Sequence, residues 1–362
     1  MNRFFSDIRK NFGFGLMRLP MAGTDVDIPQ MKDMVDAFLA AGFNYFDTAR
    51  PYLQGRSELA VRECLVKRYP RNSFILTNKL SNGCFEQEAD IRPFFQSQLE
   101  ACGVEYFDFY LHHAMSEVRH EKYTATRAYD IVKELKAEGK IRHIGMSFHH
   151  SPEVLDRILT ERPEIEVVQL QFNYVDMLDP VVQSQACYDV CVKHGKPVIV
   201  MEPVRGGALV NLPRQITEQM TACSPAGYAL RFAAGHDNIM MVLSGMSTME
   251  QMADNISTMA DFRPLNEQEL VLIDRARTAY QSAHKIPCTA CRYCTDGCPA
   301  GIPIPDVFAC FNDKKQEKQG ADAAYAAFES NASACVGCGQ CEAVCPQQLH
   351  IRQLLEEVAK VF

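Results

Sequence analysis

The sequence predicts an α/β fold, a (β/α)8 barrel of the TIM type, followed by a small, mainly helical, cysteine-rich domain. From residue 13 to residue 260, short β-branched or aromatic runs alternate with amphipathic stretches. Eight of the 15 cysteines then follow residue 287 in two short groups. Such alternation over about 250 residues is typical of parallel βα units. We therefore expect a barrel at residues 1–265, a helical linker at 266–285 and the cysteine-rich domain at 286–362.

Eight short runs have the composition of buried strands. They lie at residues 14–19, 43–47, 74–77, 106–111, 141–146, 166–170, 197–201 and 239–243. Eight helical patterns accompany them, at residues 29–41, 57–69, 89–102, 125–138, 152–160, 180–194, 225–234 and 249–259. Gly139 and Gly195 stand where two of these helices should end. A doubly wound open sheet is the rival topology, but the first βα turn lacks the G-x-G-x-x-G motif that would support it.

The apolar content and the net charge of the chain indicate what class of protein it is. Apolar residues make up 47% of the chain, so a substantial core is expected. The formal net charge is −8 and no basic block is present, which argues against nucleic acid as a partner. The sequence has neither a signal-peptide core nor an apolar stretch long enough to span a membrane. We expect a soluble, cytoplasmic protein without a membrane partner.

Two cysteine runs share the spacing C-x2-C-x2-C-x3-C-P. Their members are Cys288, Cys291, Cys294 and Cys298 in the first run, and Cys335, Cys338, Cys341 and Cys345 in the second. This is the spacing of bacterial two-cluster ferredoxins, in which the fourth cysteine of a run ligates the other cluster. We therefore expect two [4Fe–4S] clusters, with Cys345 completing the first and Cys298 completing the second. Zinc also uses C-x2-C pairs, but its sites usually combine two separated pairs, so iron–sulfur is favoured.

Polar residues at the ends of the predicted strands suggest a proton-transfer site, because barrel active sites lie at the carboxyl ends of strands. Asp47 ends the second strand, Lys79 follows the third, and His112 and His113 follow the fourth. Tyr52 comes five residues after Asp47. A lysine cation beside a phenol favours phenolate, so we expect Lys79 to lower the pKa of Tyr52. The tyrosine could then act as general acid or base near neutral pH.

The sequence resembles the aldo/keto reductase family over roughly residues 10–262. The matching segments are GFGLMRLP at 13–20, FDTA at 46–49 followed by Tyr52, GKIRHIGMS at 139–147, QLQFNY at 169–174 and G-x-S-x-x-E-Q-x-x-x-N at 245–255. By this resemblance Tyr52 would be the proton donor, with Lys79 and Asp47 tuning it. His113, rather than His112, would orient the substrate carbonyl.

The resemblance also implies a nicotinamide cofactor. Ser147 and Gln169 match contacts to the carboxamide, Pro203, Val204 and Gly207 match the pyrophosphate loop, and Gly245, Ser247, Gln251 and Asn255 match the adenosine-side segment. Phe148 replaces an asparagine of many members, and Met201 replaces a stacking aromatic residue. The basic residues that many members use for the 2′-phosphate are missing. NADP(H) or NAD(H) is expected, with NADP(H) slightly favoured, and a flavin in the barrel mouth is the alternative.

The two kinds of expected cofactor transfer different numbers of electrons. A nicotinamide transfers a hydride, whereas a [4Fe–4S] cluster usually passes one electron. A flavin could mediate, the clusters could serve the substrate directly, or they could be structural or regulatory. Our hypothesis is an oxidoreductase acting on a small-molecule carbonyl or alcohol, with the clusters as an electron relay. The alternative is an electron-transfer or redox-sensing protein that binds nucleotide or flavin with little turnover. Either could use a redox partner protein.

Overall fold

The structure is a computed structural model that describes residues 3–282, 286–316 and 318–362. Eight parallel strands close into a barrel in the order β1-β10-β9-β8-β7-β6-β5-β4. The strands are β1 (Phe12–Gly15), β4 (Tyr45–Asp47), β5 (Ile75–Leu80), β6 (Phe107–Met115), β7 (Ile141–Phe148), β8 (Val167–Gln171), β9 (Val198–Met201) and β10 (Ile239–Gly245). The predicted (β/α)8 barrel is confirmed.

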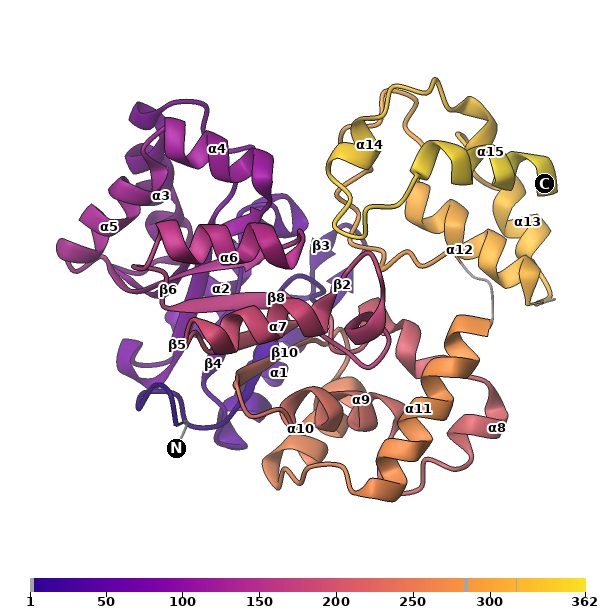
Figure 1. Cartoon of the computed structure of the whole chain (residues 1–362), viewed down its shortest axis with the longest axis horizontal. Coiled ribbons are helices and arrows are strands. Elements are labelled where there is room, and N and C mark those ends of the chain that lie inside the picture. The colour runs from indigo at the N-terminus through magenta and orange to yellow at the C-terminus, as the bar shows by residue number, and fades with distance from the viewer. Residues whose placement is uncertain (1–2, 283–285, 317) are drawn as a thin grey trace.

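Helices follow the strands as the amphipathic patterns predict. They are α1 (Ile28–Ala40), α2 (Arg56–Val61), α3 (Glu88–Cys102), α5 (Ala128–Ala137), α6 (Pro152–Glu161), α7 (Ser184–Lys193), α9 (Pro225–Ala234) and α10 (Met249–Ala260). Side chains cap several of them: Asp27 accepts a hydrogen bond from Gln30 N at the start of α1, and Ser224 accepts one from Gly227 N at the start of α9. Their apolar faces share one large core with the barrel strands. Figure 1 shows helices such as α6 and α7 on the outside of the barrel.

Two segments of the barrel differ from the sequence prediction. The first strand was expected at residues 14–19, but it ends at Gly15 because the chain turns there and forms the small hairpin β2 (Met21–Ala22) and β3 (Asp25–Val26). No element was predicted between the strand at 106–111 and the helix at 125–138, but this stretch contains most of helix α4 (Glu117–Ala125), whose sequence is too polar to show an apolar stripe. Arg127, at a φ of 54°, separates α4 from α5.

The segment predicted to be a helical linker, residues 266–285, contains helix α11 (Glu267–Ser282). The last three residues of this segment, 283–285, lie outside the described residues. Three side chains of α11, Leu272, Ile273 and Ala276, are buried in the barrel's own core. No helix in the described part of the chain is long and apolar enough to cross a membrane.

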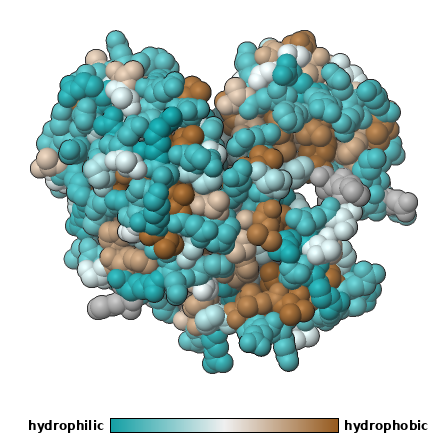
Figure 2. Space-filling model, viewed as in Figure 1, coloured by the Kyte–Doolittle hydropathy of each residue, from teal (hydrophilic) through white to brown (hydrophobic). Residues whose placement is uncertain are grey.

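The cysteine-rich domain is mainly helical, as predicted. Its helices are α12 (Ile304–Lys315), α13 (Ala321–Ala326), α14 (Gln340–Ala343) and α15 (Ile351–Val361). They surround a second core, separate from the barrel core, that includes Ile304, Phe308 and Leu355. Figure 2 shows the two parts as lobes with a notch between them on this face. Contacts described below hold the domain against the carboxyl ends of the strands.

Candidate active site and iron–sulfur sites

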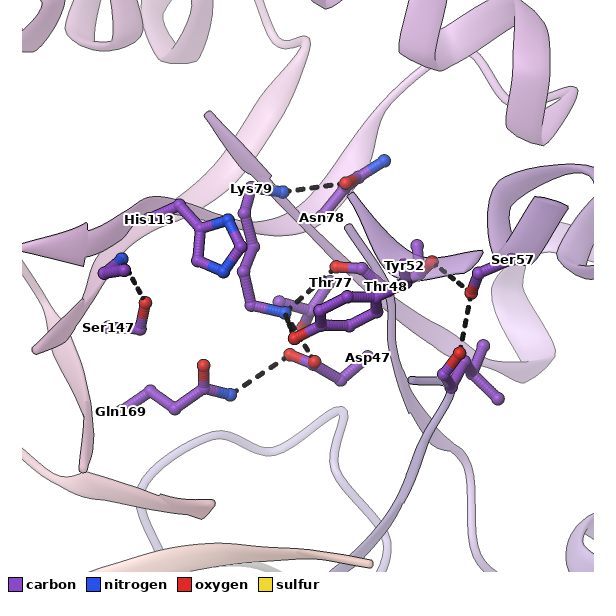
Figure 3. Close-up of polar contacts among 12 residues, drawn as sticks. Asp47, Thr48, Tyr52, Ser57, Thr77, Asn78, Lys79, His113, Ser147 and Gln169 are labelled. Carbon is purple, nitrogen blue, oxygen red and sulfur yellow. Dashed lines mark hydrogen bonds and ion pairs between the residues drawn. The ribbon is translucent and has the colours of Figure 1, made fainter. Parts of the chain in front are cut away.

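Three neighbouring strands and one turn bring the four expected catalytic residues together (Figure 3). Asp47 is the last residue of β4, Lys79 lies near the end of β5, and His113 lies on β6. Tyr52 begins the 3₁₀ turn η1 (Tyr52–Gly55) that follows β4. Because these strands pair in parallel, their ends meet at one edge of the barrel. All four side chains are buried, and Lys79 has no exposed surface.

The Lys79 ammonium group is the centre of this site. Nζ donates to Asp47 Oδ1 at 2.5 Å, to the Thr48 carbonyl at 3.0 Å and to the Tyr52 hydroxyl at 3.1 Å. An ammonium group has three hydrogens, so each one has an acceptor. Burial lowers the pKa of Lys79 and raises the pKa of Asp47, and the ion pair between the two opposes both changes. The geometry favours the charged pair.

The prediction that Lys79 lowers the pKa of Tyr52 is wrong for this site. Burial raises that pKa well above its ordinary value, and the carboxylates of Asp47 and Glu202 raise it further. The cost of moving a phenolate out of water therefore outweighs the nearby cations. Tyr52 is held as a protonated phenol, which can donate a proton.

The two adjacent histidines have different environments. His113 Nδ1 lies 2.7 Å from Ser81 Oγ, and its ring stands edge-on to Tyr52, with centroids 6.2 Å apart. Burial lowers the pKa of His113 well below its usual value, so the imidazole is neutral. His112 instead packs against Tyr129, with ring centroids 4.5 Å apart, and neither of its ring nitrogens has a hydrogen-bond partner among the described residues. The structure therefore places His113, rather than His112, at the mouth.

Ser147 and Gln169 lie beside this group, paired in register on β7 and β8. Gln169 Nε2 donates to Asp47 Oδ2 at 3.2 Å, so Asp47 is held from two sides. Ser147 Oγ accepts from Ala114 N at 2.6 Å, which fixes the end of β6. Both side chains are buried at the mouth, where a carboxamide could reach them.

A cleft of about 490 Å³ runs from the mouth along the loop after β9 to the start of α10. Its lining includes the remaining seven residues expected to bind nucleotide, namely Pro203, Val204, Gly207, Gly245, Ser247, Gln251 and Asn255. Ser247 N donates to Gln251 Oε1 at 2.7 Å, and Ser247 Oγ donates to the Arg18 carbonyl at 3.0 Å. A helix amino terminus beside a glycine-containing loop suits a pyrophosphate, so these residues fit a dinucleotide.

The cysteine-rich domain also reaches this cleft, which sequence reasoning missed. Arg18 Nη2 donates to the Thr289 carbonyl at 2.7 Å, and Arg18 Nη1 lies 3.4 Å from Glu202 Oε1. Thr289 stands between the first two cysteines of the first run. Its carbonyl lies against Gly206, where an added Cβ would approach within 2.3 Å. Gly206 has a φ of 63°, so the sequence needs glycine there for two reasons.

The first cluster site has a cavity of its own. Cys288, Cys291, Cys294 and Cys345, the four residues assigned to one cluster, line it together with apolar side chains such as Ile304 and Phe308. Ala290 N donates to Cys288 Sγ at 3.4 Å. Burial raises the pKa of Cys291 and of Cys294 to about 12, so bound iron would be needed to hold them as thiolates. This donor set and its apolar surroundings fit an iron–sulfur cluster.

The second site is less enclosed. Its expected ligands are Cys335, Cys338, Cys341 and Cys298. Cys341 is buried and lies within electrostatic range of Cys335, whereas Cys338 is exposed. Gly337 and Gly339, with φ of 72° and 77°, bend the loop that carries the three cysteines of the second run. The sulfur donors also fit a cluster here, one closer to solvent than the first.

The closed barrel, the buried tetrad and the cysteine-rich domain define an oxidoreductase built on a (β/α)8 barrel. The chain matches the aldo/keto reductase family over residues 11–221 and a 4Fe-4S dicluster domain over residues 287–349. The chain belongs to the aldo/keto reductase family, and it is an iron–sulfur member of it.

Individual relatives agree with this assignment. The uncharacterized oxidoreductase YqkF of Bacillus subtilis (strain 168) is 25% identical over 293 residues, which cover 71% of this chain and 89% of that protein. The holo form of aldo-keto reductase AKR11C1 from Bacillus halodurans superposes with a TM-score of 0.62 at 26% identity, covering 74% of this chain and 92% of that one. An aldo-keto reductase from Klebsiella pneumoniae in complex with NADPH shares the fold, with a TM-score of 0.62 at 18% identity, covering 75% of this chain and 96% of that one.

Proposed function

We propose that this protein interconverts a carbonyl and an alcohol with a nicotinamide cofactor, using Tyr52 as the proton donor. The observation that carries the proposal is the buried chain of contacts from Asp47 through Lys79 Nζ to the Tyr52 hydroxyl. It joins a protonated phenol to a cation that can stabilise the phenolate left after proton donation.

Each residue then has a defined task in carbonyl reduction. Tyr52 donates its proton to the carbonyl oxygen as the carbonyl carbon gains a hydride, which together give an alcohol. Lys79 stabilises the resulting phenolate, and Asp47 balances the lysine charge in this buried site. His113, which is neutral, can donate a hydrogen bond that orients the carbonyl oxygen. The reverse sequence, with the phenolate as base, oxidises the alcohol.

The cleft residues would hold the cofactor, with Ser147 and Gln169 on its carboxamide and the loop after β9 on its pyrophosphate. When bound, a nicotinamide supplies or accepts the hydride. The test is a fall in NADPH or NADH absorbance at about 340 nm that requires an added carbonyl compound. No dependence on any member of a broad carbonyl panel would contradict the proposal.

We also propose that two [4Fe–4S] clusters act as an electron relay. The first would be held by Cys288, Cys291, Cys294 and Cys345, and the second by Cys335, Cys338, Cys341 and Cys298. In this arrangement ligation is crossed, which means that the fourth cysteine of each run binds the cluster of the other run. Cys345→Ala should then remove the same EPR signal as Cys288→Ala, and Cys298→Ala the same signal as Cys335→Ala. If Cys345→Ala removes the signal lost in Cys335→Ala, ligation is not crossed.

A second candidate function is an electron-transfer or redox-sensing protein, which could dock a redox partner protein at the cysteine-rich domain. The contact between the Thr289 carbonyl and Gly206 favours it, because a ligand loop of the first cluster touches the nucleotide loop. An anaerobic titration with NADPH and then NADH, followed by EPR and a flavin assay, separates the candidates. Tight nucleotide binding with negligible turnover supports sensing. Reduction of the clusters by nucleotide supports the relay and requires a mediator such as a flavin.

A further inference from the structure

Arg119 is a half-buried cation without a carboxylate partner. It lies in the first turn of α4, directly after the strand that carries His113. Its Nη1 donates to the Ala114 carbonyl, which fixes the guanidinium beside the end of β6. In the part of the chain that the structure describes, no Asp or Glu forms an ion pair with it. Burial lowers the pKa of Arg119, as expected for a cation that has lost water without gaining an anion.

The surroundings of Arg119 place it at the active-site mouth. It lies within electrostatic range of His113 on β6 and of His149, which follows β7. It also interacts with Tyr293, which stands in the first cysteine run and lies within electrostatic range of Tyr52. Arg119 is therefore within electrostatic range both of the catalytic residue His113 and of a loop of the cysteine-rich domain.

The other charges of the mouth are balanced. Lys79 is paired with Asp47, and Arg18 with Glu202. The two histidines are neutral, because burial lowers the pKa of His149 to about 4 and that of His113 well below its usual value. Among the described residues, Arg119 thus gives the mouth one uncompensated positive charge. A partly desolvated, unpaired cation is unfavourable for stability and is typical of a site that receives an anion.

The first cluster does not account for this charge. Besides burial, the groups that shift the pKa of Arg119 are Tyr123 and Tyr293, and Arg119 in turn shifts the pKa values of His113 and His149. Arg292 is the arginine that interacts with Cys288 and Cys294, and it is already paired with Asp306 at 2.6 Å. The Arg119 guanidinium instead contacts the Ala114 carbonyl, one residue after His113 at the end of β6.

We propose that Arg119 binds a carboxylate of the substrate beside Tyr52 and His113, so that the substrates are carbonyl compounds that also carry a carboxylate. The planar guanidinium presents parallel N–H groups that match a carboxylate in two hydrogen bonds. Tyr293 lies within electrostatic range of Arg119, so the subsite draws on residues of both the barrel and the cysteine-rich domain. This inference rests on the proposed function, because the bound carboxylate compound is a substrate only if the protein acts on its carbonyl group. Anion binding by Arg119 can be tested separately.

The binding test uses benzoate and its neutral analogue benzamide, measured by isothermal titration calorimetry on the cluster-loaded protein with and without NADP⁺. We expect benzoate to bind at least tenfold more tightly than benzamide, a preference worth about 1.4 kcal/mol. Arg119→Gln should abolish the preference, and Arg119→Lys should restore part of it. Lys122→Gln, which removes a charge from the same helix that is already paired with Glu86, should leave it unchanged. A benzoate preference that persists in Arg119→Gln, or that is missing in the wild-type protein, overturns the proposal.

Turnover gives an independent measurement. We expect a higher kcat/KM for 4-carboxybenzaldehyde than for 4-nitrobenzaldehyde, and Arg119→Gln should remove most of this ratio through KM. If neither aldehyde is reduced, the carbonyl function fails, while the benzoate titration still decides the anion site. If Arg119→Gln changes the cluster spectrum and leaves benzoate binding intact, Arg119 serves the cluster and the proposal is wrong.

Discussion

Gln347 and Gln171 exchange two side-chain hydrogen bonds, of 2.7 and 3.0 Å, across the boundary between the cysteine-rich domain and the barrel. Gln347 follows Cys345, a proposed ligand of the first cluster, by two residues, and Gln171 is the last residue of β8. Both side chains are buried. Gln171 also donates to Asp176 Oδ2 at 2.6 Å, and the other oxygen of Asp176 lies 2.8 Å from Arg205 Nε. The loop that carries Cys345 is thus joined by buried polar contacts to Arg205, the residue before Gly206.

Removing one amide from this pair should weaken the docking of the domain. In Gln347→Ala, the buried amide of Gln171 loses an acceptor and a donor, which typically costs about 1–3 kcal/mol of unfolding free energy. We expect a lower midpoint of denaturation, measured anaerobically by circular dichroism on cluster-loaded protein. Gln340→Ala, an exposed change in the same domain, is the control and should shift the free energy by less than about 0.5 kcal/mol. Equal midpoints for the two variants would show that the pair does not hold the domain.

The close approach of Thr289 to Gly206 gives a second prediction. Gly206→Ala places a methyl group against the Thr289 carbonyl and should push the cysteine loop away from the nucleotide cleft. Gly301→Ala is a matched control, because Gly301 has the same φ of 63° and open space around it. Each variant bears the strain of a left-handed alanine, about 1–2 kcal/mol. Only Gly206→Ala should also weaken NADPH binding, measured by calorimetry, and comparable NADPH affinity in both variants would contradict this account.

His112 makes the stability of the fold depend on pH. Burial lowers its pKa to about 3, so below about pH 6.5 the unfolded chain takes up a proton that the folded chain refuses. Stability should therefore fall as the pH falls, by about 1.4 kcal/mol per pH unit for this residue. His112→Leu removes two ring nitrogens that lack partners among the described residues, and should raise stability at neutral pH by about 1–3 kcal/mol. The excess in unfolding free energy of His112→Leu over the wild type should be larger at about pH 5.5 than at neutral pH. Denaturation curves at these two pH values measure it, and an equal excess at both would refute the prediction.

Tyr52 should keep its proton through the alkaline range. Its pKa is raised by burial above the ordinary value near 10, so carbonyl reduction should not slow between about pH 7 and pH 9 through loss of this proton. The measurement is the pH profile of kcat/KM at saturating nucleotide. A fall in rate near pH 8 that disappears in Tyr52→Phe would mean that Lys79 does lower the pKa when the site is loaded.

Local sequence patterns were sufficient to predict the barrel. β-Branched and aromatic runs marked all eight strands, and the residues after them marked the mouth, because side chains at the ends of parallel strands converge whatever the loops do. Helix α4 was missed because its exposed, polar sequence has no apolar stripe and its position depends on Ser116 and on packing of His120 and Tyr123. Arg119, which lies on that helix, was missed with it.

The contacts between the two domains could not be predicted from local patterns. Gln171 and Gln347 are 176 positions apart in the sequence, and neither glutamine carries a motif. The shift of the Tyr52 pKa was predicted in the wrong direction. The charged residues near Tyr52 can be inferred from the strand ends, but its burial depends on which segments cover the barrel mouth. The cysteine-rich domain supplies part of that cover through Tyr293, the tyrosine between Cys291 and Cys294.

The most direct test of the account is the turnover of Tyr52→Phe. The variant keeps the ring and removes only the hydroxyl that receives the Lys79 hydrogen bond. With NADPH and a carbonyl compound that the wild-type protein reduces, we predict a fall in kcat of about 10²–10⁴-fold, with NADPH affinity and cluster spectra unchanged. Turnover at the wild-type rate would show that Tyr52 is not the proton donor and would contradict the proposed chemistry.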